Sequence, residues 1–463
     1  MFFSISTIVL WNGPARLIPG YKDGLPVART EQGLARGDMW TSRNGSYFNV
    51  FRGIPYAKQP VGERRFKPPE QLDIHDHWEG VQDFNWEMPR CYQVDMITGF
   101  LVGKEDCLKL NVFSPDLSPK KLLPVMVWIH GGAFVSGDSG TAMWGPHYFM
   151  DHNIVLVSIH YRLGPLGFLS LGTEDIAGNM GLWDQRMALL WVRHNIKQFG
   201  GDPSKVTIFG ESAGSMAVNF HMLSPESRGL FSKAIMQSGT VFSSFLESSK
   251  RAKSFGLRFA ESVGCDKRNQ VVECLRSVPA HELYEHLQIF DKDCPLRSDL
   301  GFTHIGPWKP VVDNFIDKPF LPKTPEEVLK NKEENPVPCI IGFNKEDGLL
   351  LSTRFLKDPD IQEYFIKNKD VCAPIYLLGK DKEVATEEDV KTADKLIQSY
   401  SKSGLNTSFT DYTDLFTDAI FAAGTHKLVN YLVQNNRKVF KYMFSYRGNY
   451  TSIKDMIYNS FLS

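Results

Sequence analysis

The sequence lacks the features that direct a chain to nucleic acid, to a bilayer or to a metal ion. Its 463 residues contain 52 lysines and arginines and 53 aspartates and glutamates, a formal net charge of −1. This balance gives no electrostatic reason to bind nucleic acid. No apolar run approaches the roughly 20 residues that span a bilayer. The seven cysteines form no C-x-x-C pair and no Cys/His zinc pattern. We therefore expect no nucleic-acid partner, no integral membrane segment, no metal and no cofactor.

The cysteine spacing bears on the compartment in which the protein folds. Cys91 and Cys107 are 16 positions apart, and Cys265 and Cys274 are 9 positions apart. Two local disulfides fit these short gaps and would imply an oxidising compartment.

Two further features favour secretion or the lumen of the secretory pathway. Residues 1–24 are a possible leader, because residues 1–11 form a short apolar run. That run lacks a basic start and a small-x-small cleavage site, so an ordinary buried strand is the alternative. Three N-x-[ST] sequons are candidate glycosylation sites, at Asn44, Asn406 and Asn449.

Short apolar, β-branched runs alternate with helical patterns along the chain. Six of these runs are expected to be buried strands, over residues 125–129, 154–159, 206–209, 234–236, 339–342 and 439–444. Residues 182–199 have helical spacing. Continuously apolar strands indicate a sheet covered on both faces, and hence a mostly parallel one. The alternation predicts a doubly wound α/β architecture, as a single domain over residues 25–463.

A G-x-S-x-G pentapeptide identifies a candidate nucleophile, Ser212. It follows the predicted strand 206–209 and precedes a helical stretch from Ala213. This strand–turn–helix context is the one that a nucleophile elbow requires. The small flanking residues Gly210 and Gly214 would let strand and helix pass close together. The helix N-terminus would favour negative charge that develops beside the serine.

A second glycine turn, which begins at His130, follows the predicted strand 125–129. An HGG turn after a strand supplies backbone N–H donors to a tetrahedral oxyanion in esterases and lipases. The expected donors are the backbone amides of Gly131, Gly132 and Ala213. His130 starts the turn and does not face the nucleophile, so we expect it to support the turn and not to act as a base.

These motifs, with several others in order, resemble the type-B carboxylesterase family, which also contains cholinesterases and juvenile-hormone esterases. The match runs over residues 26–448 and is similar to arthropod secreted carboxylesterases. The further motifs are FRGIPYA at residues 51–57, RFKPP at 65–69, EDCLKLN at 105–111, YRLGPLGFL at 161–169, GNMGLWDQ at 178–185 and FGGDP at 199–203. The resemblance implies the α/β-hydrolase fold, ester hydrolysis through an acyl-serine intermediate, and a small-molecule ester as substrate.

The resemblance also implies how particular residues pair. It implies disulfides Cys91–Cys107 and Cys265–Cys274, together with structural ion pairs Arg52–Glu105 and Arg162–Asp184. Breaking one partner of a buried ion pair would leave an uncompensated charge.

The acid of the catalytic triad is expected in the stretch Asn344-Lys345-Glu346-Asp347-Gly348. The family's acid directly precedes the glycine, which selects Asp347. Most relatives carry glutamate there, so aspartate shortens the reach by one methylene. Glu346 is the fallback, and a solvated turn carboxylate is the simpler interpretation of that residue.

The histidine of the triad should follow the acid. After Asp347 the sequence contains only His426, in a segment with the pattern of an amphipathic helix. The family's base lies in a G-x-x-H loop after the strand that corresponds to residues 439–444, and the sequence ends at Ser463 before such a motif. We therefore expect the chain as written, a partial or shortened form, to lack its base and to be impaired or inactive. His426 as a substitute base is the alternative.

Two other functions compete with ester hydrolysis by a general carboxylesterase. A non-catalytic binding or adhesion protein on the same fold usually loses the serine or the oxyanion glycines, and this chain keeps both. A cholinesterase carries a choline-binding tryptophan in the loop closed by the first disulfide, and residues 92–106 contain none. We expect a monomer or a homodimer, and the sequence does not identify the physiological ester.

Overall fold

The computed structural model describes residues 20–22, 24–96, 98–243, 246–266, 270–287, 308–357, 359–380, 385–400 and 408–446. Most of the possible leader lies outside these residues, and so do the sequons at Asn406 and Asn449. Asn44 is exposed in the turn between two strands. Within the described part of the chain, no helix is both long and apolar enough to cross a bilayer.

A nine-stranded sheet forms the centre of the described structure, in the order β15-β14-β13-β12-β10-β11-β9-β5-β4. All neighbours from β15 to β11 are parallel, and the remaining pairs are antiparallel. The strands are β4 (Asp38–Thr41), β5 (Tyr47–Pro55), β9 (Lys109–Ser114), β10 (Leu123–Ile129), β11 (Val155–Ile159), β12 (Gly201–Glu211), β13 (Lys233–Gln237), β14 (Cys339–Asn344) and β15 (Val439–Phe444).

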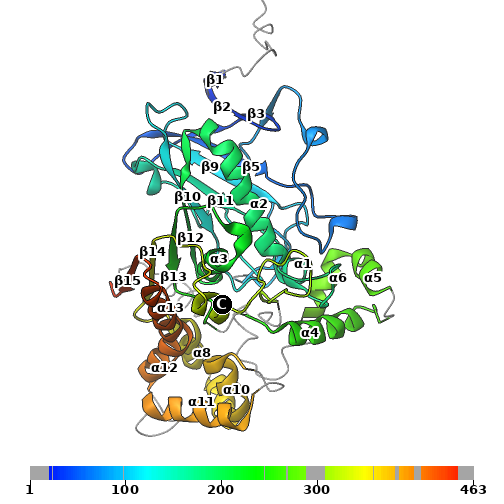
Figure 1. Ribbon diagram of the computed structural model, residues 1–463, viewed down its shortest axis with the longest axis vertical. Coiled ribbons are helices and arrows are strands. Elements are labelled where there is room, and N and C mark those ends of the chain that lie inside the picture. The colour runs from blue at the N-terminus through cyan, green and yellow to red at the C-terminus, as the bar shows by residue number, and fades with distance from the viewer. Residues whose placement is uncertain are drawn as a thin grey trace, which may run out of the picture.

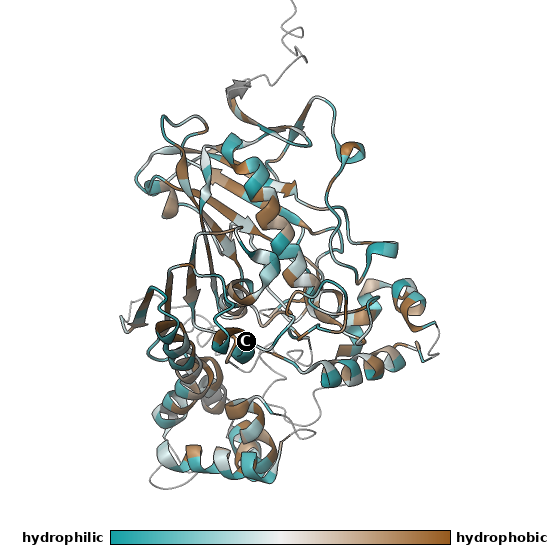
Figure 2. Ribbon diagram, viewed as in Figure 1, coloured by the Kyte–Doolittle hydropathy of each residue, from teal (hydrophilic) through white to brown (hydrophobic). Residues whose placement is uncertain are grey.

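The six predicted strands are confirmed as the parallel part of this sheet. Every residue of β11 is buried, as expected of a strand that is apolar except for Ser158 and is covered on both faces. Figure 2 shows hydrophobic residues concentrated on these central strands. The antiparallel extension by β9, β5 and β4 was not predicted.

Helices cover the sheet and support its edge (Figure 1). The predicted helix 182–199 is α2 (Met180–Asn195), continued by a 3-10 turn over Ile196–Phe199. The stretch after the elbow serine is α3 (Ala213–Leu223), which is buried along its whole length. Further helices are α1 (Gly164–Phe168), α4 (Ser249–Ser262), α5 (Val271–Ser277), α6 (Ala280–Glu285), α7 (Pro325–Lys330) and α13 (Ala423–Gln434).

A group of helices at the bottom of Figure 1 has a hydrophobic core of its own. Phe355, Phe365, Tyr412 and Phe416 pack together in this core. The group consists of α8 (Leu349–Lys357), α9 (Pro359–Lys367), α10 (Lys369–Leu378), α11 (Glu387–Tyr400) and α12 (Phe409–Phe416), followed by a π-helical turn over Thr417–Ala422. The single domain over residues 25–463 stays a prediction.

Small sheets complete the described fold. Strands β1 (Gly20–Lys22), β2 (Leu25–Thr30), β3 (Gly33–Arg36) and β6 (Val81–Asp83) form one of them. Strands β7 (Gln93–Val94) and β8 (Leu101–Val102) pair in the loop closed by a disulfide between Cys91 and Cys107. That disulfide and the one between Cys265 and Cys274 confirm both predicted pairings.

One of the two predicted ion pairs is wrong. Arg52 does not pair with Glu105; it binds Glu87 at 3.0 Å and lies over the ring of Trp40. Glu105 is taken instead by Arg65, whose Nε and Nη2 donate to the two carboxylate oxygens at 2.7 and 2.5 Å. The two arginines are only 13 positions apart (65 − 52), and the sequence did not show which side chain would reach the carboxylate.

The predicted pair Arg162–Asp184 is confirmed. The Nε and Nη2 atoms of Arg162 donate to the two oxygens of Asp184 at 2.8 and 2.7 Å. The Arg162 backbone N–H adds a third bond to the same carboxylate at 3.0 Å. The two side chains are 3% and 0% exposed. This pair joins the segment after β11 to the first turns of α2.

Asp184→Asn should therefore destabilise the protein by about 3–5 kcal/mol, because it leaves the buried Arg162 uncompensated. The free energy of unfolding, measured by chemical denaturation, checks this. Glu333→Gln is the matched control: Glu333 pairs with Lys323 at the surface, and its loss should cost less than about 1 kcal/mol. Equal losses for the two variants would contradict the structural role assigned to the buried pair.

Candidate active site

Ser212 lies at the junction of β12 and α3 with a left-handed backbone, φ 56° and ψ −122°. A non-glycine residue in this region is strained by roughly 1–3 kcal/mol and persists only where its surroundings hold it. The Ser212 N–H donates to the Gln237 carbonyl of β13 at 2.8 Å, and its C=O accepts from Met216 at 3.0 Å. These bonds fix the serine at the carboxyl end of the parallel strands.

The glycines on either side of Ser212 are required by close packing. A Cβ on Gly214 would collide with the carbonyl oxygen of Ile129, the last residue of β10. A Cβ on Gly210 would lie 2.5 Å from the Gly214 backbone and 2.7 Å from the same carbonyl. Strand β12, helix α3 and the end of β10 therefore meet without room for a side chain, as the motif predicted.

The glycine turn after β10 lies directly against the serine. A Cβ on Gly131 would be 3.2 Å from the Ser212 Cβ and 2.6 Å from the Glu211 carbonyl oxygen. The next three residues have positive φ: Gly132 at 102°, Ala133 at 55° and Phe134 at 64°. Among the described residues, the N–H groups of Gly131 and Gly132 have no acceptor. They are available to a ligand atom above Ser212.

His130 supports the turn from below. Its Nδ1–H donates to the Gly131 carbonyl at 2.8 Å, and its ring stacks on Tyr161 with centroids 4.3 Å apart. The Tyr161 hydroxyl donates to the His130 carbonyl at 2.8 Å. Burial lowers the pKa of His130 to about 4, so its imidazole is neutral at pH 7. A neutral ring that bonds to one backbone carbonyl and stacks on Tyr161 agrees with a supporting role.

In the turn after β14, the two candidate acids, Asp347 and Glu346, have different neighbours. Both oxygens of Asp347 accept bonds from Asn344, at 2.9 Å from its N–H and 2.8 Å from its side-chain amide. Burial raises the pKa of Asp347, and a hydrogen bond from Ser238 opposes the shift. Asp347 also acts electrostatically on Glu211, the neighbour of Ser212. Burial raises the pKa of Asp414 on α12, and the charge of Glu346 adds to this shift, so Glu346 lies on the side of the helical group.

The helical group anchors the acid turn. The Gly348 N–H donates to the Thr417 hydroxyl at 2.8 Å, and that hydroxyl donates to the Thr413 carbonyl at 2.7 Å. A Cβ on Gly348 would collide with the same Thr413 carbonyl. The π-helical turn that begins at Thr417 therefore fixes the backbone next to Asp347.

Two side chains of the site were not predicted from the sequence. Burial, and then the charge of Asp347, raise the pKa of Glu211 to about 7. The Tyr442 phenol on β15 is close enough to Asp347 and Glu211 for their charges to raise its pKa, although burial is the larger cause. Glu211 could have been identified from its position inside the elbow motif. Tyr442 could not, because only the pairing of β14 with β15 brings it to the site.

His426 lies on α13, is exposed, and has its ring edge-on to Phe343 with centroids 6.3 Å apart. Among the described residues it has no hydrogen bond to Asp347 or Ser212. No group of three or more histidines, cysteines, aspartates or glutamates in the described residues could hold a metal ion.

The chain matches the model of the carboxylesterase family over residues 25–460. It is 34% identical to venom carboxylesterase-6 of Apis mellifera, covering 92% of this chain and 76% of that protein. It is 33% identical to juvenile hormone esterase of Tribolium castaneum, covering 93% and 74%.

Among solved structures it resembles juvenile hormone esterase from Manduca sexta with OTFP covalently attached. The TM-score is 0.82 at 30% identity, over 93% of this chain and 80% of that one. The α/β-hydrolase fold is thereby confirmed, and the chain belongs to the carboxylesterase family as a carboxylic ester hydrolase.

Proposed function

We propose that this carboxylesterase hydrolyses its ester through an acyl-serine intermediate on Ser212. The observation that carries the proposal is the meeting of a strained serine with a glycine turn whose N–H groups have no acceptor among the described residues. An oxyanion above Ser212 would bind the amides of Gly131, Gly132 and Ala213. Such preorganised donors stabilise the charge that develops in acyl transfer, typically by about 3–4 kcal/mol each.

The reaction has two halves. The Ser212 Oγ attacks the carbonyl carbon, its proton passes to a general base, and the tetrahedral oxyanion collapses to expel the alcohol. Water then attacks the acyl-serine in the same way and releases the carboxylic acid. Asp347 is proposed as the acid that orients a histidine base. We assign the base to none of the described residues, since His426 is exposed and packs against Phe343.

The alternative of a binding protein without catalysis is less well supported. Such a protein would have no need of a positive-φ serine or of positive φ at Ala133 and Phe134 in the adjoining turn, since each strained residue costs roughly 1–3 kcal/mol. A general carboxylesterase is also favoured over a cholinesterase, because the loop closed by Cys91–Cys107 contains no tryptophan that could bind choline.

We further propose that the protein is secreted or resides in the secretory lumen. Two disulfides within the described residues and the exposed sequon asparagine Asn44 support this proposal. Glycosylation of Asn44, Asn406 and Asn449 belongs to the same proposal.

The first prediction for the active site concerns the nucleophile. A fluorophosphonate probe should label Ser212, and Ser212→Ala should abolish the label. Ser215→Ala is the matched control: the Ser215 hydroxyl is buried and donates to the Gly239 carbonyl at 2.6 Å, so its removal should leave labelling in place. Peptide mapping by mass spectrometry identifies the modified residue. Soluble, folded protein that does not react, or a label elsewhere, would contradict the acyl-serine mechanism.

The second prediction separates the two candidate acids. In protein whose histidine base is in place, Asp347→Asn should lower ester hydrolysis by ~10⁴-fold, the effect expected when a triad acid is exchanged for its amide. Glu346→Gln, one residue away in the same turn, should leave the rate within a few-fold of the parent, because Glu346 acts on Asp414. Steady-state kinetics on a chromogenic ester gives both values. A larger loss for Glu346→Gln would transfer the role of the acid to that residue.

The third prediction concerns the pH dependence of stability. The folded pKa of Glu211, about 7, lies above the ordinary value of ~4.3. The folded state therefore favours neutral Glu211, and this contribution to stability is lost as pH rises from about 4 through 7. Glu211→Gln stays neutral throughout, so its Tm relative to the parent should be higher at pH 8 than at pH 5. A Tm difference that does not change with pH would contradict the raised pKa.

A further inference from the structure

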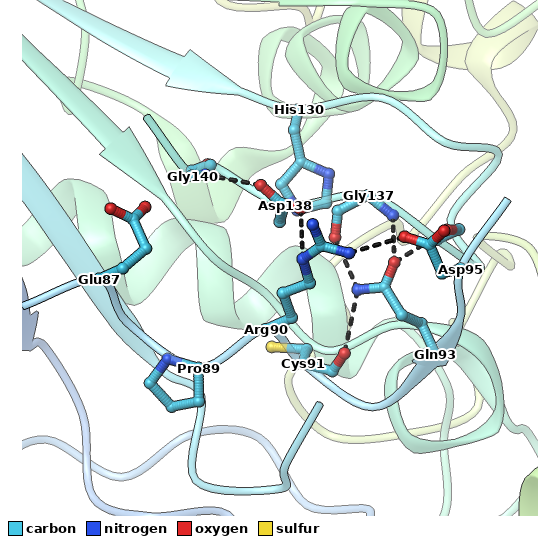
Figure 3. Close-up of polar contacts among 12 residues, drawn as sticks. Glu87, Pro89, Arg90, Cys91, Gln93, Asp95, His130, Gly137, Asp138 and Gly140 are labelled. Carbon is cyan, nitrogen blue, oxygen red and sulfur yellow. Dashed lines mark hydrogen bonds and ion pairs between the residues drawn. The ribbon is translucent and has the colours of Figure 1, made fainter. Parts of the chain in front are cut away.

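A buried glutamine lies beneath the oxyanion turn, outside the residues assigned to catalysis. Gln93 is 1% exposed and begins the short strand β7, two residues after Cys91. Its Oε1 accepts from the Ser136 hydroxyl at 2.8 Å and from the Gly137 N–H at 2.7 Å. Its Nε2 donates to the carbonyls of Gly137 at 2.8 Å and Cys91 at 3.0 Å. Figure 3 shows this side chain reaching from its own loop into the turn that follows His130.

The two residues that Gln93 holds are the ones that pack against the oxyanion glycines. A Cβ on Gly137 would lie 2.5 Å from the Gly131 carbonyl oxygen and 2.5 Å from the His130 Nδ1. A Cβ on Gly132 would collide with the Ser136 carbonyl oxygen. The Ser136 N–H also donates to the Gly132 carbonyl at 3.0 Å. A shift of Ser136 or Gly137 would therefore move Gly131 and Gly132.

The turn needs such a restraint because its backbone is strained. Ala133 and Phe134 both have positive φ, a region that residues with a Cβ rarely adopt. A strained segment keeps its conformation only when its surroundings over-determine it. Gln93 satisfies both the N–H and the C=O of Gly137 from inside the core, where a lost hydrogen bond costs more than it does in water.

The other contacts between the same two segments are more exposed. Arg90 binds Asp138 of the turn at 2.8 Å; the arginine side chain is 45% exposed and that of Asp138 is 15% exposed. Glu87 accepts from the N–H of Thr141 at 2.9 Å, near the end of the turn and farther from the glycines. An ion pair with one half-exposed partner is more open to water and salt than the hydrogen bonds of Gln93, which is 1% exposed. Gln93 is therefore the main polar link between the loop closed by Cys91–Cys107 and the oxyanion turn.

We propose that Gln93 is a positioning residue for ester hydrolysis: its carboxamide fixes Ser136 and Gly137 so that the N–H groups of Gly131 and Gly132 are directed at the oxyanion. This inference rests on the proposed function of that turn. It assigns to Gln93 no contact with the substrate. The expected deficit is therefore in transition-state stabilisation and not in substrate binding.

The test uses two substitutions at Gln93 and a control. Gln93→Met keeps the size and removes all four hydrogen bonds. Gln93→Glu keeps the two acceptor bonds but directs a carboxylate oxygen at the carbonyls of Gly137 and Cys91, so it should lose activity as well. Gln185→Met is the matched control: Gln185 is a fully buried glutamine on α2 that bonds to His221. Ser136→Ala removes a single bond to Gln93 and serves if Gln93→Met does not fold.

Gln93→Met should lower kcat by ~10–100-fold, the scale expected when reacting groups are displaced by about 1 Å. KM should stay within ~3-fold, because ground-state binding is not involved. The affinity for a trifluoromethyl ketone, which forms a tetrahedral oxyanion on the serine, should fall in parallel with kcat/KM. Ser136→Ala should give a smaller loss of the same kind, and Gln185→Met should alter stability with kcat retained.

Hydrogen exchange separates failure of this inference from failure of the proposed function. Amides of residues 131–137 should exchange faster in Gln93→Met than in the parent, with no change in α3. If the parent neither hydrolyses esters nor reacts with fluorophosphonate, the proposed function fails, and the exchange result alone decides whether Gln93 restrains the turn. A kcat loss no greater than that of Gln185→Met, or exchange of residues 131–137 that does not change, would overturn the inference.

Discussion

The site depends on the contact between the nucleophile elbow and the end of β10. Gly214 lies so close to the carbonyl of Ile129 that no side chain fits between them. This contact brings the N-terminus of α3 against the turn that starts one residue after Ile129. The reactive hydroxyl and the proposed oxyanion donors thus share one small region of backbone. Any side chain at Gly210, Gly131 or Gly214 would separate them.

Strained backbone on both sides of this contact explains why so many surrounding groups are polar yet buried. Ser212, Ala133 and Phe134 all have positive φ. The first is held by one hydrogen bond that it donates to β13 and one that it accepts from α3, and His130, Tyr161 and Gln93 surround the turn that contains the others. Each of these groups bonds to backbone atoms. The fold therefore positions the donors before a substrate arrives, which is the condition under which fixed dipoles stabilise a transition state most.

The sequence predicted the parts of the site that depend on local pattern. The elbow and the glycine turn need glycine at fixed positions beside a strand, and the strands are marked by apolar runs. Positive φ at Ala133 and Phe134 was not predicted, because neither residue type favours it. The predicted partner of Arg52 was wrong because Arg65, 13 positions away, binds Glu105 in its place. Gln93 gave no signal, since its partners in the turn lie 43 and 44 positions away and only the folded chain brings them together.

The most direct test of the account is the crystal structure of the protein after reaction with a fluorophosphonate. The account predicts phosphorus bonded to the Ser212 Oγ, with one phosphoryl oxygen ~2.7–3.1 Å from the amide nitrogens of Gly131, Gly132 and Ala213. A phosphoryl oxygen directed away from these amides would contradict the account, as would modification of a different residue.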